Sequence, residues 1–403
     1  MTVANVPAPS LWRAPGFVPT LVAVAAAFGS WGLLLPVVPL AILTAGGSNT
    51  LAGATTGVFM AVTVATQIVT PWALRRFGYT PVMVFAAMML GLPAVGYAIT
   101  DAAVAVLALC ALRGIGFGAL TVAESALVAE LVPRHQLGRA SGSLGLVIGF
   151  ANLIGLPAGL FLFEHFGATL VYVLGAAVAL IAAVMCLAIP RRRAAVVPSH
   201  TNTATKVYSV VVVVPAAAIG ATAMGFGVIS AFLPAAITGD LGGPAPVLTG
   251  VTFAVLGGAQ MVSRFAAGVI ADRRNRTGSL LLVGLLASCV GLALLCVALN
   301  AAGPGWLVVV AVGCFGAGFG VVQNEALLMM FARLPQERIS EASALWNMSF
   351  DAGTGAGSLV LGMVAARLAY TGAFAAGAMI VACACVAAVA EFGFALLRRG
   401  MRG

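Results

Sequence analysis

Two ionisable side chains stand out because they lie deep inside long apolar stretches of the chain. Arg113 and Asp351 each sit about 16 Å from the nearest end of their stretch, if the stretch is a helix that rises about 1.5 Å per residue. A charge at that depth in a bilayer costs a few kcal/mol, so both residues are functional candidates. The Asp351 carboxylate could exchange a proton, and the Arg113 guanidinium could bind an anionic group or oppose the carboxylate. The alternative is a static buried ion pair.

Two further acids lie nearer the ends of their apolar stretches. Glu124 follows Arg113 in the same stretch, whereas Glu325 belongs to a later one and has Asn324 beside it. Each acid could line a cavity and take up protons, or it could pair locally with a helix end. The first apolar stretch of the chain contains no acid, so any proton-binding carboxyl must be carried by another segment.

The stretches that carry these residues are long enough to cross a membrane. The chain is 62% hydrophobic and only 8% charged, whereas a soluble domain has about 25% charged residues. A membrane helix needs about 20 mainly apolar residues. We therefore expect an all-α polytopic membrane protein with twelve spans, at 17–44, 51–74, 82–100, 102–131, 141–163, 167–189, 208–236, 246–270, 279–300, 305–333, 341–367 and 372–397. The first stretch is too long for a signal-peptide core, which has about 15 residues, so we expect it to remain uncleaved.

The basic residues lie in alternate connections between these stretches. Basic residues concentrate on the cytoplasmic side of membrane proteins, so the pattern predicts an inner-membrane protein with both termini in the cytoplasm. The net charge of +9 is then a topology signal and not a sign of nucleic-acid binding. All but three of the 20 Lys and Arg residues follow the pattern, namely Arg13, Arg75, Arg76, Arg134, Arg139, Arg191, Arg192, Arg193, Lys206, Arg273, Arg274, Arg276, Arg333, Arg338, Arg398, Arg399 and Arg402.

The chain also shows an internal duplication. Gly116-Phe117-Gly118 recurs 202 residues later as Gly318-Phe319-Gly320, and the same shift relates Gly155 to Gly357. The expected units are a six-helix bundle at 1–189, a cytoplasmic linker at 190–207 and a second six-helix bundle at 208–403. Six crossings per unit make the repeat parallel, and parallel repeats of this kind enclose a central site that is exposed alternately to either side of the membrane. This arrangement indicates a transporter.

Several motifs resemble those of the major facilitator superfamily, over nearly the whole chain. Gly268-Val269-Ile270-Ala271-Asp272-Arg273 resembles the family's G-x-x-x-D-R signature, and Arg113-Gly114-Ile115-Gly116-Phe117-Gly118 resembles its helix-4 arginine motif. A further glycine-rich segment is similar to a motif of antiporters that export solutes, although Leu156 separates its Gly and Pro. The residues of that segment are Gly149, Asn152, Gly155, Pro157 and Gly159.

The first-half copy of the signature is altered, since Arg75 replaces its Asp. The 202-residue shift takes Arg139 to Glu341, so the charges are reversed there as well. The resemblance implies that each of these helix starts approaches the signature of the opposite half. Asp272 would then meet Arg139 and Arg75 would meet Glu341, as two cytoplasmic latches of opposite polarity. The alternative is two unrelated solvated pairs worth less than about 1 kcal/mol each. We include Arg76 and Arg273 as gate candidates, and Arg264 either joins this gate or extends toward the cytoplasm.

These observations favour a proton-coupled exporter of a small amphipathic drug or metabolite. Expected lining residues such as Trp31 and Phe319 are largely apolar. The alternatives are a proton-coupled importer of a small organic solute and a nontransporting receptor. No nucleotide-binding loop or hydrolase motif accompanies the membrane stretches, and the seven cysteines lie inside them, so we expect no enzyme activity, no cofactor and no metal site. The expected partners are the cargo, protons and the lipid bilayer, and the expected state is a monomer.

Overall fold

The computed structural model describes residues 12, 14–46, 49–192, 212–240, 245–300 and 304–400. Most of the predicted linker, at 193–207, lies outside the described residues, as do Arg13, Arg193, Lys206 and Arg402. The described residues form helices joined by short turns and contain no strand, which confirms the all-α membrane fold.

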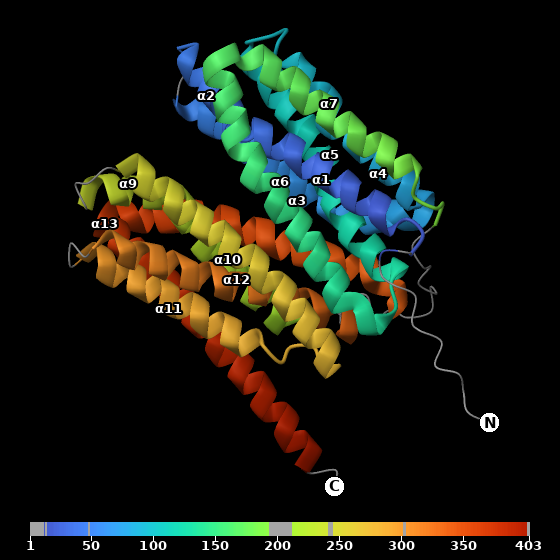
Figure 1. Ribbon diagram of the computed structural model, residues 1–403, viewed down its shortest axis with the longest axis vertical. Coiled ribbons are helices and arrows are strands. Elements are labelled where there is room, and N and C mark those ends of the chain that lie inside the picture. The colour runs from blue at the N-terminus through green and yellow to red at the C-terminus, as the bar shows by residue number, and fades with distance from the viewer. Residues whose placement is uncertain are drawn as a thin grey trace.

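The described residues form twelve α-helices (Figure 1). Two short 3-10 helices precede α6 and α13, at Arg134–Gln136 and Gln336–Arg338. The α-helices are α1 (Phe17–Leu34), α2 (Val37–Thr44), α3 (Asn49–Phe77), α4 (Tyr79–Gly96), α5 (Ala103–Leu131), α6 (Leu137–Phe166), α7 (Ala168–Leu187), α9 (Val213–Asp240), α10 (Ala245–Arg274), α11 (Leu281–Asn300), α12 (Gly305–Arg333) and α13 (Ile339–Gly400).

Three of these elements, α1, α2 and α13, do not correspond one to one with the predicted spans. Helices α1 and α2 are parts of one span, which is interrupted at Pro36 because proline lacks the N–H that a continuous helix needs. Helix α13 contains two predicted spans, which meet at a kink where Ala369 has φ 59°. Eleven segments of the described chain are long and apolar enough to cross a membrane. Residues 339–366 are helical but fall outside those eleven, since polar residues such as Asn347 and Asp351 interrupt their apolar character.

The helices pack mainly with others from their own half of the sequence (Figure 1). In the first group, α1 packs on α6 and α7, while α5 packs on α3 and α4. In the second group, α9 packs on α13, and α12 packs on α10 and α11. Two sets of contacts join the groups: α6 packs on α10, and α13 packs on α3 and α5.

Equivalent glycines allow close helix contact in both groups. A Cβ atom at Gly116 on α5 would collide with the backbone of α4, and a Cβ atom at Gly318 on α12 would collide with α11. These two glycines are related by the 202-residue shift, so the duplicated motif has the same packing purpose in each group. Close approach of small residues is a common basis of helix association in membranes.

We expect Gly116→Ala to destabilise the protein, because the added methyl group has no space between α5 and α4. Overpacking of this kind costs about 1 to 3 kcal/mol. The matched control is Gly257→Ala on α10, where a Cβ atom would meet nothing within 4 Å. The control should leave stability unchanged or raise it by up to about 1 kcal/mol. Thermal unfolding of the purified variants in detergent measures both effects, and equal melting temperatures would contradict the packing argument.

Candidate functional site

The predicted partners Arg75 and Glu341 lie together in the structure. Arg75 stands at the end of α3, and its Nη1 atom donates to Glu341 Oε1 at 2.9 Å in the first turn of α13. The two side chains are only 26% and 21% exposed. Arg338 approaches the other Glu341 oxygen at 4.0 Å. This pair therefore joins the two helix groups in a partly buried place, where an ion pair is screened less than on an open surface.

Asp272 and Arg139 also come together, but mainly through the backbone. The Asp272 carboxylate accepts hydrogen bonds of 2.8 Å from the N–H groups of Gly138 and Arg139, in the first turn of α6. The Arg139 Nε atom is 3.9 Å from the carboxylate, and its side chain is 50% exposed. An acid at a helix N-terminus satisfies free N–H groups and meets the positive end of the helix dipole. The Arg139 guanidinium was the partner expected from the sequence, whereas the main donors are backbone N–H groups at the start of α6, four residues before the predicted span 141–163.

Gly268, the glycine of the signature segment on α10, lies directly against α6. A Cβ atom at either Gly138 or Gly268 would collide with the backbone carbonyl of the other residue. The α6 and α10 backbones are thus in contact beside Asp272. Arg76 and Arg273 are exposed, and no ion pair of theirs is found among the described residues, so the structure does not bring these two candidates to partners.

Asp351 bonds to a residue that the sequence argument did not single out. Gln67 of α3 donates from Nε2 to Asp351 Oδ2 at 2.6 Å, and the same nitrogen lies 3.3 Å from the Thr121 hydroxyl on α5. Gln67 is fully buried, whereas Asp351 keeps some accessible surface. This hydrogen bond joins the two helix groups at depth. A polar glutamine inside the apolar stretch 51–74 was the available signal.

The Arg113 side chain on α5 points toward α4 and does not contact Asp351 on α13. Its Nε atom donates to the Leu90 carbonyl at 3.1 Å, and its guanidinium lies 5.7 and 5.8 Å from the ring centres of Phe59 and Tyr97. The salt bridges of the described chain include none between Arg113 and Asp351, so the static pair considered from the sequence is wrong. Depth along a helix can be counted from a sequence, but the direction in which a side chain points depends on packing.

A row of small polar side chains continues from Asp351 along the contact between α13 and α5. Asn347 Nδ2 donates to the Thr121 carbonyl at 3.2 Å, and Ser343 donates to the Val122 carbonyl at 2.7 Å. The hydroxyls of Ser343 and Ser125 are also in hydrogen-bond contact. Each bond links one helix group to the other, so this part of the contact is polar as well as close.

Glu124 and Arg264 are both buried, with 2% and 6% of their surfaces exposed. They lie on different helix groups, and their charges interact. Arg264 Nη1 donates to Gln323 Oε1 at 3.1 Å, and the guanidinium lies 5.4 Å from the centre of the Trp346 ring. Arg264 is therefore part of the contact between the groups and does not extend toward water.

Glu325 lies at a helix end instead of in a cavity. Its buried carboxylate is close to the backbone N–H groups of Gly278 and Leu280, where α11 begins, although neither makes a well-formed hydrogen bond. This position favours local pairing over proton uptake. The 202-residue shift matches Glu124 with Ala326, so Glu325 is one residue out of register and points about 100° away around the helix. Asn324 is fully buried, and its amide has no hydrogen-bond partner in the part of the chain that is described.

Phe117 and Phe319, which are related by the 202-residue shift, each belong to an aromatic cluster, one in each helix group. Trp31 is partly exposed and stacks on Phe117, with ring centres 5.3 Å apart. Phe319 stacks on Phe226 and Phe350 at 5.3 and 5.8 Å. Because Phe319 is fully buried, it packs beneath its neighbours and does not line an open surface as expected.

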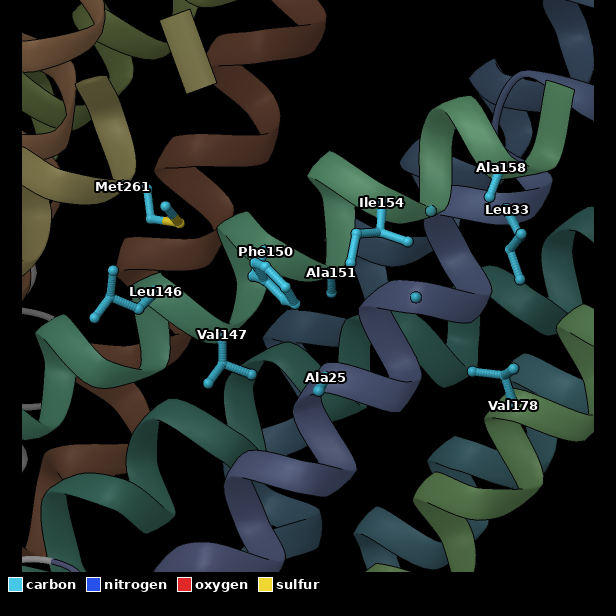
Figure 2. Close-up of a pocket in the computed structure, with 12 residues that line it drawn as sticks. Ala25, Leu33, Leu146, Val147, Phe150, Ala151, Ile154, Ala158, Val178 and Met261 are labelled. Carbon is cyan, nitrogen blue, oxygen red and sulfur yellow. The ribbon is translucent and has the colours of Figure 1, made fainter. Parts of the chain in front are cut away.

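The glycine-rich segment of α6 packs on α1 and borders an apolar hollow. Cβ atoms at Gly155 and Gly159 would crowd the backbone of α1, whereas Gly149 faces Met261 of α10. Helix α6 continues through Pro157 to Phe166, and the Asn152 side-chain oxygen has no hydrogen-bond partner among the described residues. The hollow measures about 560 Å³, and Figure 2 shows Phe150, Ala151 and Ile154 of α6 beside it.

A second hollow, of only about 20 Å³, lies at Arg113. Trp31, Phe59 and Tyr97 contribute to its wall. The Nη2 atom of Arg113 and the indole nitrogen of Trp31 have no hydrogen-bond partners within the described chain. The charged and polar candidates therefore lie at the contact between the helix groups and at this small hollow. The large apolar hollow also borders that contact, because Met261 of α10 lines it together with residues of α6.

Comparison with known proteins decides the family. The model of the Major Facilitator Superfamily matches residues 20–358. The chain belongs to the Major Facilitator Superfamily. As a member of this superfamily it is a multi-pass membrane protein with a secondary-transporter fold, which binds small-molecule substrates within a lipid bilayer.

Two solved structures show how widely the Major Facilitator fold is shared. The proton:xylose symporter XylE bound to 6-bromo-6-deoxy-D-glucose is 16% identical, with a TM-score of 0.74 over 92% of this chain and 94% of that one. The human organic anion transporter MFSD10 (TETRAN) is 14% identical, with a TM-score of 0.75 over 94% of this chain and 100% of that one. At these identities the likeness shows the fold alone.

We expect Asp272→Ala to weaken the contact between α6 and α10 far more than Arg139→Ala does. The first change removes two charge-assisted hydrogen bonds to the start of α6, worth about 1.5 to 3 kcal/mol each. The second removes a half-exposed guanidinium worth less than about 1 kcal/mol. Thermal unfolding in detergent compares the two, and an equal or larger loss for Arg139→Ala would show that the side chain carries the contact.

Proposed function

We propose that this protein is a proton-coupled secondary transporter that exports a small amphipathic drug or metabolite across the inner membrane by alternating access. The observation that carries the proposal is the hydrogen bond between Gln67 and Asp351, which places an ionisable acid at the contact between the two helix groups. Any change in the charge of this acid acts directly on the contact that must open and close during transport.

Asp351 is the proposed proton-binding residue. The residue as a whole keeps some accessible surface. It accepts a hydrogen bond from a neutral amide, and no cation forms a salt bridge with it among the described residues. Protonation removes the negative charge that strengthens this bond, because hydrogen bonds to charged groups are about twice as strong as neutral ones. Binding of a proton therefore loosens α3 from α13.

We place the cytoplasm at the end of the protein where the two helix groups are held together. The Arg75–Glu341 pair and the Asp272–Gly138 hydrogen bond both lie there, beside the connections that carry most of the basic residues. Basic residues concentrate on the cytoplasmic side. The structure then corresponds to a state closed to the cytoplasm, with both termini on that side, and the two contacts are latches that separate when the cytoplasmic side opens.

Arg113 is the proposed contact for an anionic group of the cargo. Its guanidinium is buried, carries an unpartnered Nη2 atom and faces the same small hollow as the unpartnered Trp31 nitrogen. Surrounding aromatic rings supply an apolar wall for the rest of the molecule. The hollow of about 20 Å³ has room for about one water molecule, so it must widen to admit the proposed cargo, an amphipathic solute with one acidic group.

The deciding experiment is a substrate screen followed by flux measurements. Metabolites and drugs that accumulate in cells lacking the protein are identified by mass spectrometry, and each is then tested in inside-out vesicles. An exporter driven by protons accumulates its cargo when the vesicle lumen is made acidic. Cargo uptake with the proton gradient in right-side-out vesicles would instead support a proton-coupled importer, and no flux in proteoliposomes would support a nontransporting receptor.

We expect Asp351→Asn to abolish uphill transport driven by a proton gradient, because an amide cannot exchange a proton. Downhill exchange of cargo should persist, since the alternating movement itself does not need the proton. The matched control is Glu391→Gln, which alters an acid paired with Arg333 at 2.6 Å inside one helix group. Full proton-driven transport by Asp351→Asn in proteoliposomes would disprove the coupling role.

We expect Glu341→Arg to impair transport by about tenfold, which corresponds to about 1.4 kcal/mol, because it places two cations together at the end of α3. Adding Arg75→Glu reverses the pair and should restore part of the loss. Initial rates of cargo flux in vesicles measure this rescue at equal protein levels. A double variant no better than Glu341→Arg alone would show that the pair does not act as a latch.

A further inference from the structure

The side chain of Arg264 lies against the opposite helix group at a notch left by Gly145. Arg264 belongs to α10, and Gly145 belongs to α6. A Cβ atom at Gly145 would lie 3.0 Å from Arg264 Cζ and closer still to its Cδ and Nε atoms. Any side chain at position 145 would therefore compete with the arginine for this space. The missing side chain of Gly145 is what allows a buried cation to occupy the contact between the groups.

The partners of Arg264 within its own helix group are neutral. Gln323 of α12 accepts one hydrogen bond, and the Trp346 ring of α13 lies 5.4 Å from the guanidinium. The Nε atom has no hydrogen-bond partner in the described chain. A buried cation with only neutral neighbours is expensive in an apolar environment. A balancing negative charge must come from elsewhere.

Glu124 of α5 supplies that charge from the opposite helix group. It is 2% exposed, its Oε2 atom has no hydrogen-bond partner among the described residues, and its charge interacts with that of Arg264. The thiol of Cys186 on α7 is another titratable group within range of the Glu124 charge. The two charges are separated by more than the 4.0 Å of a direct salt bridge, so their attraction acts across the contact without a hydrogen bond.

Comparison of the repeats shows that Arg264 occupies a position equivalent to Gln67. The signature positions Arg75 and Asp272 differ by 197 residues, and the same shift relates Gln67 to Arg264. Gln67 contacts Thr121 in its own helix group, and Arg264 contacts Gln323 in its own group. Thr121 and Gln323 are equivalent positions, because they are 202 residues apart.

The opposing helices complete this comparison. Gln67 faces Asp351 of α13, whereas the α6 residues equivalent to Asn347 and Asp351 are Gly145 and Gly149. One contact thus has a neutral amide against an acid, and the other has a cation against glycines. The acid that balances this cation lies instead on α5, at Glu124.

We propose that Arg264 is a state-dependent counter-cation for Glu124, seated in the Gly145 notch only while the cytoplasmic side is closed. This inference rests on the proposed alternating access. Separation of α6 from α10 withdraws the cation from the first helix group and leaves Glu124 without it. An ionised Glu124 therefore favours the closed state, and a protonated Glu124 loses the attraction and favours opening. Arg264 acts as a positioning residue that connects the charge of Glu124 to the movement of the two groups.

The test measures the ratio of closed to open protein without cargo or a proton gradient. The seven native cysteines are replaced, and spin labels are attached at His135→Cys and Thr277→Cys, two exposed positions beside the ends of α6 and α10. Distances between the labels then report the closed fraction in lipid nanodiscs. We expect Glu124→Gln and Arg264→Gln each to lower the closed-to-open ratio by about tenfold, or about 1.4 kcal/mol. Each variant should also make the dependence of this ratio on pH shallower. Glu124→Gln removes the titrating acid, and Arg264→Gln removes the cation through which the charge of that acid acts on the contact.

The combined variant separates a specific interaction from general damage. If the two charges act on each other, Glu124→Gln with Arg264→Gln should lower the ratio no further than either change alone. Gly145→Ala should also lower it, although it changes no charge, because the notch is filled. The matched control is Glu391→Gln, which removes an acid paired within one helix group and should leave the ratio and its pH dependence unchanged.

Two results would overturn the proposal: a wild-type ratio in Arg264→Gln, or fully additive effects in the combined variant. If Arg264→Gln fails to fold, it is replaced by Arg264→Lys, which keeps the charge. The effect of Glu124→Gln is then measured with and without Arg264→Lys. Failure here can be distinguished from failure of the proposed function. If the protein shows proton-driven flux but Glu124→Gln does not change the closed fraction, only the counter-cation role of Arg264 is refuted. A closed fraction that responds as expected, in a protein without proton-driven flux, refutes proton-coupled transport alone.

Discussion

The cost of placing polar groups in hydrocarbon determines where every ionisable residue of the membrane region lies. A charged side chain in a bilayer must be paired, hydrogen-bonded or reached by water. In this protein the contact between the two helix groups meets that requirement. Gln67 with Asp351, Arg264 with Gln323, and Asn347 with Thr121 all lie there. The bonds of Gln67 and Asn347 also hold the two groups together, so charge and conformation depend on one contact surface.

The two halves of that surface have the same plan but different chemistry. On one side, the latch is an ion pair between the side chains of Arg75 and Glu341. On the other side, it is an acid bonded to the backbone at the start of α6, where the Gly138 and Gly268 backbones touch. The deeper positions differ in the same way, with an acid facing Gln67 in one contact and a cation in a glycine notch in the other. A duplicated chain has thus become asymmetric in the place where proton binding would act.

Much of this arrangement could be predicted from the sequence because it depends on periodic or counted properties. Apolar length indicated the spans. The repeat shift from Arg139 to Glu341, together with the family resemblance, predicted the pairing of Arg75 with Glu341. The direction of individual side chains could not be counted in that way. Arg113 and Asp351 have equal depth but point to different neighbours, and Glu325 is turned away from the central contact by a one-residue change of register. The backbone donors to Asp272 were missed because residue types alone do not reveal free N–H groups.

The backbone contact at Gly138 and Gly268 has a consequence for how this protein can change during evolution. Since the hydrogen bonds to Asp272 come from the main chain, almost any residue at position 139 can supply the same N–H group. The neighbouring glycines have no such freedom, because any added side chain would separate α6 from α10. Homologous sequences should therefore vary freely in charge at position 139 while keeping the two glycines and the acid. The apparent partner of the signature acid would then differ from one relative to the next, although the contact itself stays the same.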